Sequence, residues 1–370
     1  GENMMHALKR FGTAFGGYKM MENYPVPECG PDDIILEIKA AAICGADMKH
    51  WGVDNGYDDT NITPDQQQSV RGHEFAGEIV KVGENVKDWH IGQRVVSDNS
   101  AHVCGVCPAC EQGDFLCCEH KVNLGLDNNT WGGGFSKYCK VPGEILAIHK
   151  HAIWEIPEGI KYEEACVLDP ICNAYKAVAQ QSHLIPGQDV VVFGTGPLGL
   201  FSVQVAKLMG AVNIVMVGLD DDVKVRFGVA KELGATHCVN GSKEDVVARC
   251  TEICGRDNLG LVIECSGANI ALKQAIEMTR PNAEIVRVGM GFKPLEFSIN
   301  DITAWNKSII GHMAYDSTSW RNCIRLLQSG QIKVQPMITH RLGLSQWQEG
   351  FDKMAKKEAI KVIFHYDYED

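Results

Sequence analysis

The pattern of apolar and polar positions changes character along the chain. The first third has short apolar runs separated by turn residues, and these runs predict strands at 33–42, 75–82 and 94–96. From about residue 157 onward, apolar strands alternate instead with segments of helical periodicity. The chain therefore predicts a β-rich region followed by an α/β region.

The α/β region has a regular order of elements. Strands are predicted at 190–193, 213–217, 261–265 and 284–288, with helices at 198–209 and 271–278 and another that ends at Gly234. Strands that alternate with helices in this way form a parallel sheet covered on both faces. The remaining chain predicts a helix at 320–328 and an apolar strand at 359–364.

A glycine-rich turn directly follows the first strand of this region and opens a helix. In this setting the glycines permit a tight turn, let the backbone approach a pyrophosphate, and let helix and strand pack closely. The helix N-terminus also favours negative charge. We therefore interpret the turn as a dinucleotide-binding loop, formed by Gly194, Gly196, Pro197, Leu198 and Gly199.

The carboxylate that would bind the ribose of the dinucleotide is not at its usual position in the sequence. Gly218 ends the next strand, where a carboxylate usually stands, and Asp220, Asp221 and Asp222 follow at once. Three carboxylates with no adjacent arginine would repel a 2′-phosphate. The sequence therefore favours NAD over NADP, with Asp220 or Asp221 as the ribose-binding residue. A solvated acidic turn is the alternative.

Four cysteines lie close together on one short segment. Cys104, Cys107, Cys110 and Cys118 have the spacing C-x2-C-x2-C-x7-C. Four thiolates with no open position describe a structural zinc site. Cys117 is a spare thiol beside the set, and the length of the last gap favours Cys118 as the ligand.

A second set of metal-binding residue types is mixed. Cys44, His73 and a carboxylate would give zinc a thiolate, an imidazole and an oxygen ligand, and leave a position for water or an alcohol. Zinc in such a site makes a hydroxyl more acidic, which hydride loss from the same carbon requires. The alternative is that Cys44 and His73 have only a structural role.

Composition narrows the possible functions. The chain has 370 residues, enough for about two domains, and a net charge of −12. This charge argues against a nucleic acid or an anionic membrane as partner, and no apolar run is long enough to span a bilayer. The 15 cysteines include a set at metal spacing and several in apolar stretches, which favours a reducing, cytoplasmic location over a disulfide framework.

Taken in order, these motifs resemble the medium-chain zinc-dependent alcohol dehydrogenase superfamily over nearly the whole chain. The matching motifs are Cys44-Gly45-x-Asp47, Gly72-His73-Glu74 with Gly77, the four-cysteine loop and the dinucleotide loop. Asp169-Pro170 resembles the sorbitol and polyol dehydrogenase branch, which has glutamate and proline here. Other alcohol dehydrogenases have a cysteine ligand at this point.

The resemblance implies a fold and a reaction. The fold is α/β, with a GroES-like, mainly β catalytic domain at 1–158 and 302–370 and an inserted Rossmann domain at 159–301. The reaction is the NAD-dependent oxidation of a secondary alcohol in a small-molecule polyol, by a homodimer or homotetramer. The alternative substrates are an amino alcohol such as threonine, a simple diol or a sugar-alcohol phosphate. A catalytically silent NAD-binding zinc protein is a further alternative.

The resemblance also implies a structural zinc and a catalytic zinc in each chain. It places Cys44, His73, Glu74 and Asp169 at the catalytic ion. If Cys44 and both carboxylates bound zinc together, the site would carry a net negative charge and be a weaker Lewis acid. We therefore expect at least one carboxylate to act through water or to exchange with the substrate.

Two positions depart from the family pattern. The family usually has Ser or Thr at the place of Ala46, where the hydroxyl begins a proton relay. His50, a water chain or the substrate's own hydroxyls are the candidate replacements. An arginine that helps to hold the polyol in sorbitol dehydrogenases is replaced by Ala314, next to Tyr315. Sorbitol itself is therefore not the expected substrate.

Overall fold

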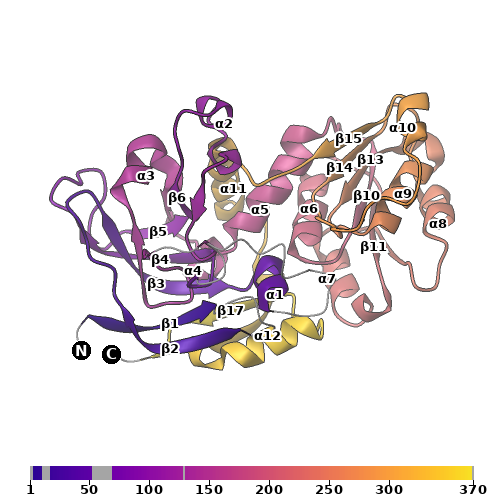
Figure 1. Ribbon diagram of the computed structural model, residues 1–370. Coiled ribbons are helices and arrows are strands. Elements are labelled where there is room, and N and C mark those ends of the chain that lie inside the picture. Colours follow the sequence, from indigo (N-terminus) through magenta and orange to yellow (C-terminus); the bar gives the residue numbers. More distant parts are fainter. Residues whose placement is uncertain (1–2, 11–16, 52–68, 128–129, 369–370) are drawn as a thin grey trace. The chain divides into compact units, whose positions relative to one another are not determined.

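The chain divides into two compact units. The computed structural model describes residues 3–10, 17–51, 69–127 and 130–368 (Figure 1). The first unit is Gly1–Asp169 with Ile338–Asp370, and the second is Pro170–Met337. Each unit has its own large sheet, and no helix of the described residues is long and apolar enough to cross a membrane.

The first unit is organised around a mixed sheet. Among the described residues its order is β16-β17-β3-β4-β5-β9, with β8 paired to β3. These strands are β3 (Ile34–Ala42), β4 (Glu74–Val82), β5 (Arg94–Ser97), β8 (Tyr138–Val141), β9 (Ile153–Glu155), β16 (Ile338–Gly343) and β17 (Lys361–His365). All of these pairings are antiparallel except that of β16 with β17. Alternating side chains such as Leu36 and Phe75 form the core of this β-rich unit.

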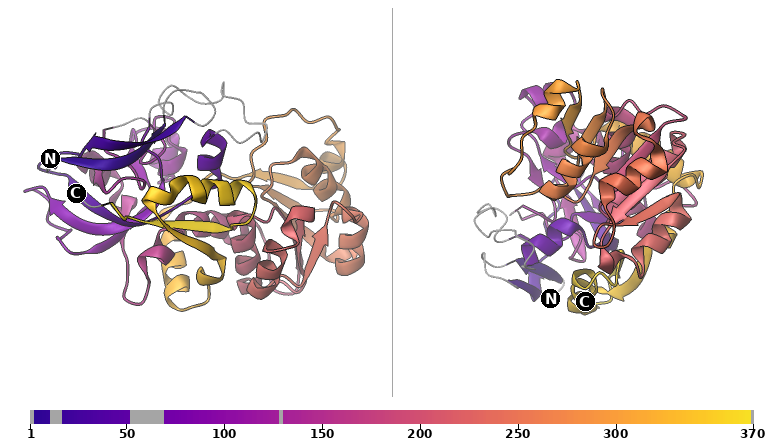
Figure 2. Two further views of the ribbon diagram at one scale, coloured as in Figure 1. Left: turned by 90° about the horizontal axis from the view of Figure 1, so that it is seen from below. Right: turned by 90° about the vertical axis from the view of Figure 1, so that its right-hand side faces the viewer.

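Smaller elements complete the first unit. Strands β1 (Met4–Arg10) and β2 (Tyr18–Pro25) form a hairpin, and β6 (Ser100–His102) pairs with β7 (Val122–Asn123). The helices are α1 (Gly45–Trp51), α2 (Pro108–Glu111), α3 (Gly143–Ile148), α4 (Tyr162–Ala165) and α12 (Trp347–Ala355). Helix α12 contacts β16 and β17 (Figure 2). Helix α5 (Leu168–Tyr175) begins at the end of this unit.

The second unit contains the predicted parallel sheet. Its strand order is β12-β11-β10-β13-β14-β15, and every neighbouring pair is parallel. The strands are β10 (Asp189–Phe193), β11 (Ile214–Gly218), β12 (His237–Asn240), β13 (Leu259–Glu264), β14 (Glu284–Arg287) and β15 (Ser308–Gly311). The helices after α5 are α6 (Pro197–Leu208), α7 (Arg226–Leu233), α8 (Val246–Cys254), α9 (Asn269–Met278), α10 (Asn300–Ala304) and α11 (Ser317–Gln328).

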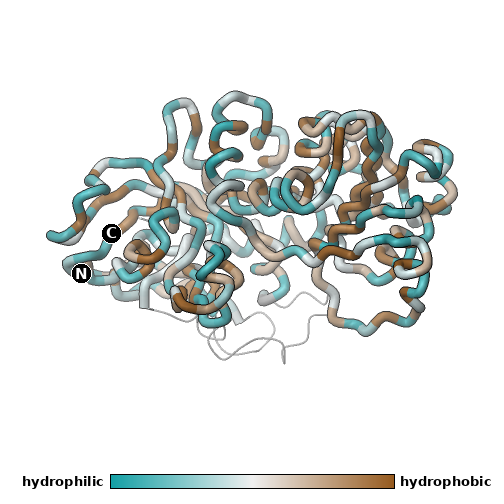
Figure 3. Tube along the Cα trace, turned by 90° about the horizontal axis from the view of Figure 1, so that it is seen from above, coloured by the Kyte–Doolittle hydropathy of each residue, from teal (hydrophilic) through white to brown (hydrophobic). Residues whose placement is uncertain are grey.

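Helices cover both faces of this sheet. Val191 and Phe193 of β10 share a core with α8 and α9, whereas α6 contacts β10 and β11 and packs beside α7. Because neighbouring side chains on a strand point to opposite faces, all five residues of β10 are buried. The hydrophobic stretches of these strands stand out in Figure 3. The predicted α/β fold class with a doubly wound parallel sheet is thus confirmed.

The chain returns to the first unit later than the sequence predicts. The prediction places the return at residue 302, but the division lies after Met337, and the earlier boundary lies after Asp169 instead of at 158. The reason is that β15 pairs with β14 and so extends the second sheet. Strand β15 is short and largely exposed, so its sequence carries no strong strand pattern.

Candidate zinc and dinucleotide sites

Cys44, His73 and Glu74 lie together in the first unit. One ligand atom from each residue lies within 4.8 Å of the other two. Strand pairing explains this, because Ala42 at the end of β3 is opposite Glu74 at the start of β4. The residues that follow β3 and precede β4 therefore meet at the same end of the sheet.

Asp47 orients two members of this group. Its Oδ2 accepts a hydrogen bond from the Cys44 N–H at 2.9 Å, and its Oδ1 lies 3.7 Å from His73 Nδ1. Asp47 is fully buried, and Arg71 Nη2 lies 3.7 Å from the same carboxylate. Burial alone would lower the pKa of His73, but the Cys44 thiolate and Asp47 raise it well above its ordinary value. A carboxylate beside an imidazole is the arrangement that fixes ring orientation in metal sites.

Glu74 has a buried cation as partner. Lys361 Nζ donates to Glu74 Oε1 at 2.6 Å and to the Ile43 carbonyl at 3.1 Å, and both charged side chains are almost completely buried. Burial would lower the pKa of Lys361, but the charges of Glu74 and Cys44 raise it overall. With this cation, a zinc ion near Cys44, Glu74 and Asp169 would leave the site neutral instead of negative.

Lys361, the buried partner of Glu74, is not among the residues that the sequence motifs indicate. A signal for it is nevertheless present, because it is a single lysine within the predicted apolar strand 359–364. The register of β17 and β3 pairs Ile363 with Ala42, which brings Lys361 alongside the segment that leads to Cys44. A charge inside a buried strand predicts a buried partner.

Asp169 lies outside the group of three. Its Oδ2 accepts a hydrogen bond from Asn99 Nδ2 at 3.1 Å. The same nitrogen donates to the main-chain oxygen of His73 at 3.2 Å. The Asn99 side chain therefore links Asp169 to the main chain of His73. Asp169 does not belong to the group of clustered ligand atoms.

The residues present fit a zinc ion. A thiolate, an imidazole and a carboxylate are donors that zinc prefers, and Glu74 Oε2 is buried without a hydrogen-bond partner among the described residues. Ala46 lies on α1 and offers no hydroxyl. His50 is on the same helix, but its side chain lies outside the described part of the structure.

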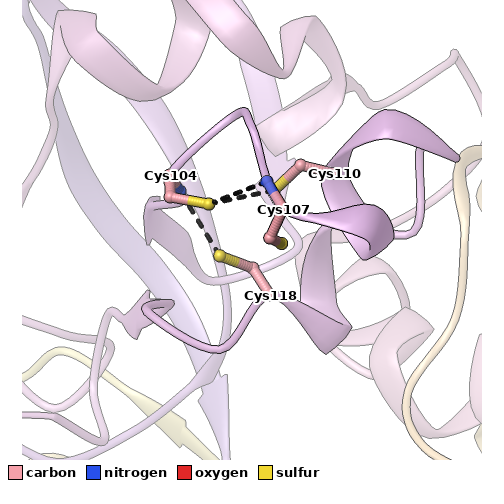
Figure 4. Close-up of side chains that lie close together, drawn as sticks. All are labelled: Cys104, Cys107, Cys110 and Cys118. Atoms are coloured by element: carbon pink, nitrogen blue, oxygen red, sulfur yellow. Dashed lines mark hydrogen bonds between the residues drawn. The ribbon is translucent and has the colours of Figure 1, made fainter.

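The four-cysteine segment forms a compact group between β6 and β7 (Figure 4). The Sγ atoms of Cys104, Cys107, Cys110 and Cys118 all lie within 4.8 Å of one another, and Cys117 is not part of the group. Main-chain N–H groups of Cys107 and Cys104 donate to the sulfurs of Cys104 and Cys118, each at 3.3 Å. A main-chain hydrogen bond from Cys110 lowers the pKa of Cys107 to about 6. The segment therefore presents four sulfurs at a spacing that fits one zinc ion.

The dinucleotide loop joins β10 to α6. A Cβ atom on Gly199 would lie 1.8 Å from the carbonyl oxygen of Gly194, so only glycine allows the helix to approach the strand this closely. Gly196 is the N-cap of α6, Pro197 is its first residue, and Leu198 follows in the first turn. The loop thus has the strand–turn–helix context that dinucleotide binding requires.

Asp222 is hydrogen-bonded to this loop. Its Oδ1 accepts from Thr195 Oγ1 at 2.7 Å, and its Oδ2 accepts from the Leu219 N–H at 2.9 Å. A Cβ on Gly218 would lie 2.7 Å from Asp222 Oδ2, so this carboxylate fills the space beside the end of β11. Asp220 and Asp221 are exposed. The sequence feature that could have indicated Asp222 is its position three residues after Leu219. A carboxylate at this position can accept a hydrogen bond from the main chain at the start of a helical turn.

Comparison with known proteins agrees with this combination of fold and sites. A family model described as zinc-binding dehydrogenase matches residues 197–329, and one described as alcohol dehydrogenase GroES-like domain matches residues 30–151. The chain therefore belongs to the medium-chain zinc-dependent alcohol dehydrogenases.

Three relatives cover nearly the whole chain. The zinc-type alcohol dehydrogenase-like protein YdjL of Escherichia coli K12 is 77% identical, over 99% of this chain and 100% of its own. Sorbitol dehydrogenase of Halalkalibacterium halodurans is 30% identical, over 97% of this chain and 98% of its own. L-threonine 3-dehydrogenase of Rhizobium rhizogenes is 32% identical, over 98% of this chain and 99% of its own.

A solved structure gives the same result for the fold. The crystal structure of 2R,3R-butanediol dehydrogenase from Bacillus subtilis superposes with a TM-score of 0.83 at 29% identity. It covers 98% of this chain and 100% of its own. The similarity therefore extends through both units.

Proposed function

We propose that this protein oxidises a secondary alcohol of a polyol to a ketone and transfers the hydride to NAD. The observation that carries this proposal is Asp169, a carboxylate hydrogen-bonded beside His73 where other alcohol dehydrogenases have a cysteine ligand. The similarity to a sorbitol dehydrogenase supports the same substrate class.

The side chains of the mixed site have distinct roles in this proposal. Zinc held by Cys44 and His73 would supply a Lewis acid that makes the substrate hydroxyl more acidic. Asp47 holds the Cys44 amide and faces the His73 ring, while Lys361 balances the charge of the third donor, Glu74. Because Ala46 has no hydroxyl, a neighbouring hydroxyl of the polyol or a water chain carries the proton away. His50 is the protein side chain that would take the place of the relay hydroxyl. A substrate with several hydroxyls suits a site that lacks its own.

NAD is the proposed hydride acceptor. The buried carboxylate of Asp222 fills the end of β11, and Asp220 and Asp221 add negative charge at the same turn. Arg226 lies close to Asp222 and Asp221, so its charge is opposed by theirs. Lys243 Nζ lies 3.9 Å from Asp220, so the three carboxylates still outnumber the two cations that they face. A 2′-phosphate is therefore disfavoured, whereas a ribose diol could donate hydrogen bonds.

A substrate panel tests the proposed function. Purified, zinc-loaded protein is assayed for nicotinamide reduction at alkaline pH with four- to six-carbon polyols, their phosphates, simple diols and threonine, each with NAD and NADP. We expect turnover of a free polyol, with NAD preferred. Activity confined to threonine, a diol or a phosphate would move the protein to that substrate class, and a preference for NADP would contradict the role of the acidic turn. If no compound in the panel is oxidised although both zinc ions are present, the result would favour the non-catalytic alternative.

We also propose that the protein is a homo-oligomer, joined through the edge of the second sheet. Among the described strands β15 pairs only with β14, so it presents an unpaired strand edge. Trp305 and Ile299, which precede it, are about half exposed, and Ile309 is 37% exposed. A second copy of this chain would cover these apolar side chains and continue the sheet.

Sedimentation velocity tests this assembly. Ile309→Lys is expected to shift the protein toward a monomer, because it buries a charge in the proposed interface. Val212→Lys is the matched control, since Val212 is equally apolar and 59% exposed but precedes β11 on the other half of the sheet. A wild-type protein that sediments as a monomer would contradict the proposal. No disulfide joins any of the 15 cysteines, all of which lie within the described residues, and this fits the reducing, cytoplasmic location that we propose.

A further inference from the structure

Asn99 connects a residue of the mixed site to the carboxylate that distinguishes the polyol branch. Its side-chain nitrogen donates to the His73 carbonyl at 3.2 Å and to Asp169 Oδ2 at 3.1 Å. An amide NH2 group has two hydrogens, so both bonds can form at once. Asn99 itself is 5% exposed, which makes this a buried and specific connection.

The backbone at Asn99 is held in an uncommon conformation. Its φ is 59°, in the left-handed region that asparagine adopts more readily than other residues with a side chain. The Asn99 N–H donates to Ser97 Oγ at 2.9 Å, and its carbonyl accepts from the Leu124 N–H at 2.7 Å. The turn is therefore fixed on both sides of the residue.

The neighbouring residue adds a buried anchor to this turn. Asp98 Oδ2 lies 2.6 Å from His149 Nε2, and Asp98 Oδ1 accepts from the Ser100 N–H at 3.0 Å. The Asp98 N–H donates to the Ala152 carbonyl at 3.0 Å. Both Asp98 and His149 are buried. These bonds hold the main chain of the turn and leave the Asn99 amide directed at His73 and Asp169.

We propose that Asn99 is a positioning residue that holds Asp169 beside the zinc site while keeping it out of the set of direct ligands. Aspartate is one methylene shorter than the glutamate of the sorbitol branch, so its reach toward the metal is smaller. The oxygen that accepts the Asn99 hydrogen bond is directed toward the amide, and Asp169 is not among the three clustered ligand residues. This inference rests on the proposed zinc site, and it concerns the ligand set instead of the substrate.

Metal binding tests the role of Asn99 without relying on turnover. Asn99→Gly keeps access to the left-handed backbone but removes the amide, and Asn99→Asp keeps the shape but places a second carboxylate against Asp169. Asn306→Gly is the matched control, because Asn306 also has a left-handed φ, of 52°, and lies in the second unit. The readouts are zinc affinity of the mixed site by chelator competition and the visible spectrum of the cobalt-loaded protein.

Both substitutions of Asn99 are expected to shift the cobalt spectrum, because Asp169 is then no longer held by the amide and can approach the ion, and to change the zinc affinity of the mixed site by at least about 10-fold. The Asn306→Gly protein should match the wild type. Asn99→Asp also keeps the test valid if Asn99→Gly does not fold. Unchanged affinity and spectrum in both Asn99 variants would overturn the proposal.

A double-mutant cycle separates a link through Asp169 from general damage to the turn. If Asn99 acts by holding Asp169, Asn99→Gly should have much less effect on the cobalt spectrum when Asp169 is already alanine. Full additivity of the two substitutions would contradict the proposal. The cycle remains interpretable if the substrate panel finds no alcohol that turns over, so failure of the proposed function and failure of this inference are distinguishable.

Discussion

Lys361→Met is expected to lower the free energy of unfolding of the first unit by about 3–5 kcal/mol, because it leaves the Glu74 carboxylate buried without its cation. Zinc affinity of the mixed site should change as well, since the charge balance around Cys44 changes. Urea unfolding followed by circular dichroism, together with zinc content, measures both effects.

Two further variants show whether the ion pair is responsible. Lys361→Met combined with Glu74→Gln should recover much of the lost stability, because neither charge is then buried alone. Lys307→Met is the matched control, since Lys307 is also buried but donates to the main-chain oxygens of Ile276 and Thr279 in the second unit. It should leave zinc content unchanged. A Lys361→Met protein as stable as the wild type would show that the pair contributes little.

Cys118→Ser is expected to remove one zinc ion from each chain, because it deletes one of four sulfurs that lie within 4.8 Å of one another. We expect affinity at this site to fall by more than about 100-fold, beyond the cost of losing an outer partner of a ligand. Atomic emission analysis after dialysis against a weak chelator measures the loss, and the melting temperature should fall with it.

The neighbouring thiol supplies the control for this experiment. Cys117 adjoins Cys118 in sequence but lies outside the four-sulfur group. Cys117→Ser should therefore retain both zinc ions. The opposite pattern, with zinc lost from Cys117→Ser and kept in Cys118→Ser, would show that Cys117 is the ligand.

The parts of the fold that could be predicted are those encoded locally. The strand that ends at Phe193, the glycine-rich loop and the helix that follows are neighbours in sequence, so their pattern identifies them before any tertiary contact is known. The four cysteines likewise occupy one short segment, and their spacing alone brings the thiols together. The edge strand β15 has no such pattern, and the division between the two compact units lies after Met337, whereas the sequence predicts a boundary at residue 302.

The partners of the mixed site depend on distant parts of the chain. Lys361 reaches Glu74 across 287 positions, and Asn99 reaches Asp169 across 70. A motif search examines neighbours, so neither contact is visible until the sheet registers are known. Asp222 shows the intermediate case, because all three aspartates were evident but only the packing at Gly218 shows which of them is buried against the loop.

The position of β17 in the first unit also has a consequence for the order in which the protein is made. Glu74 leaves the ribosome 287 residues before Lys361. At about 5–20 residues per second, this interval lasts about 15–60 s. The second unit, which is continuous in sequence, is synthesised in full during that time, whereas the first unit waits for its last strands. The Glu74 carboxylate therefore acquires its buried cation only when synthesis of the chain is nearly complete.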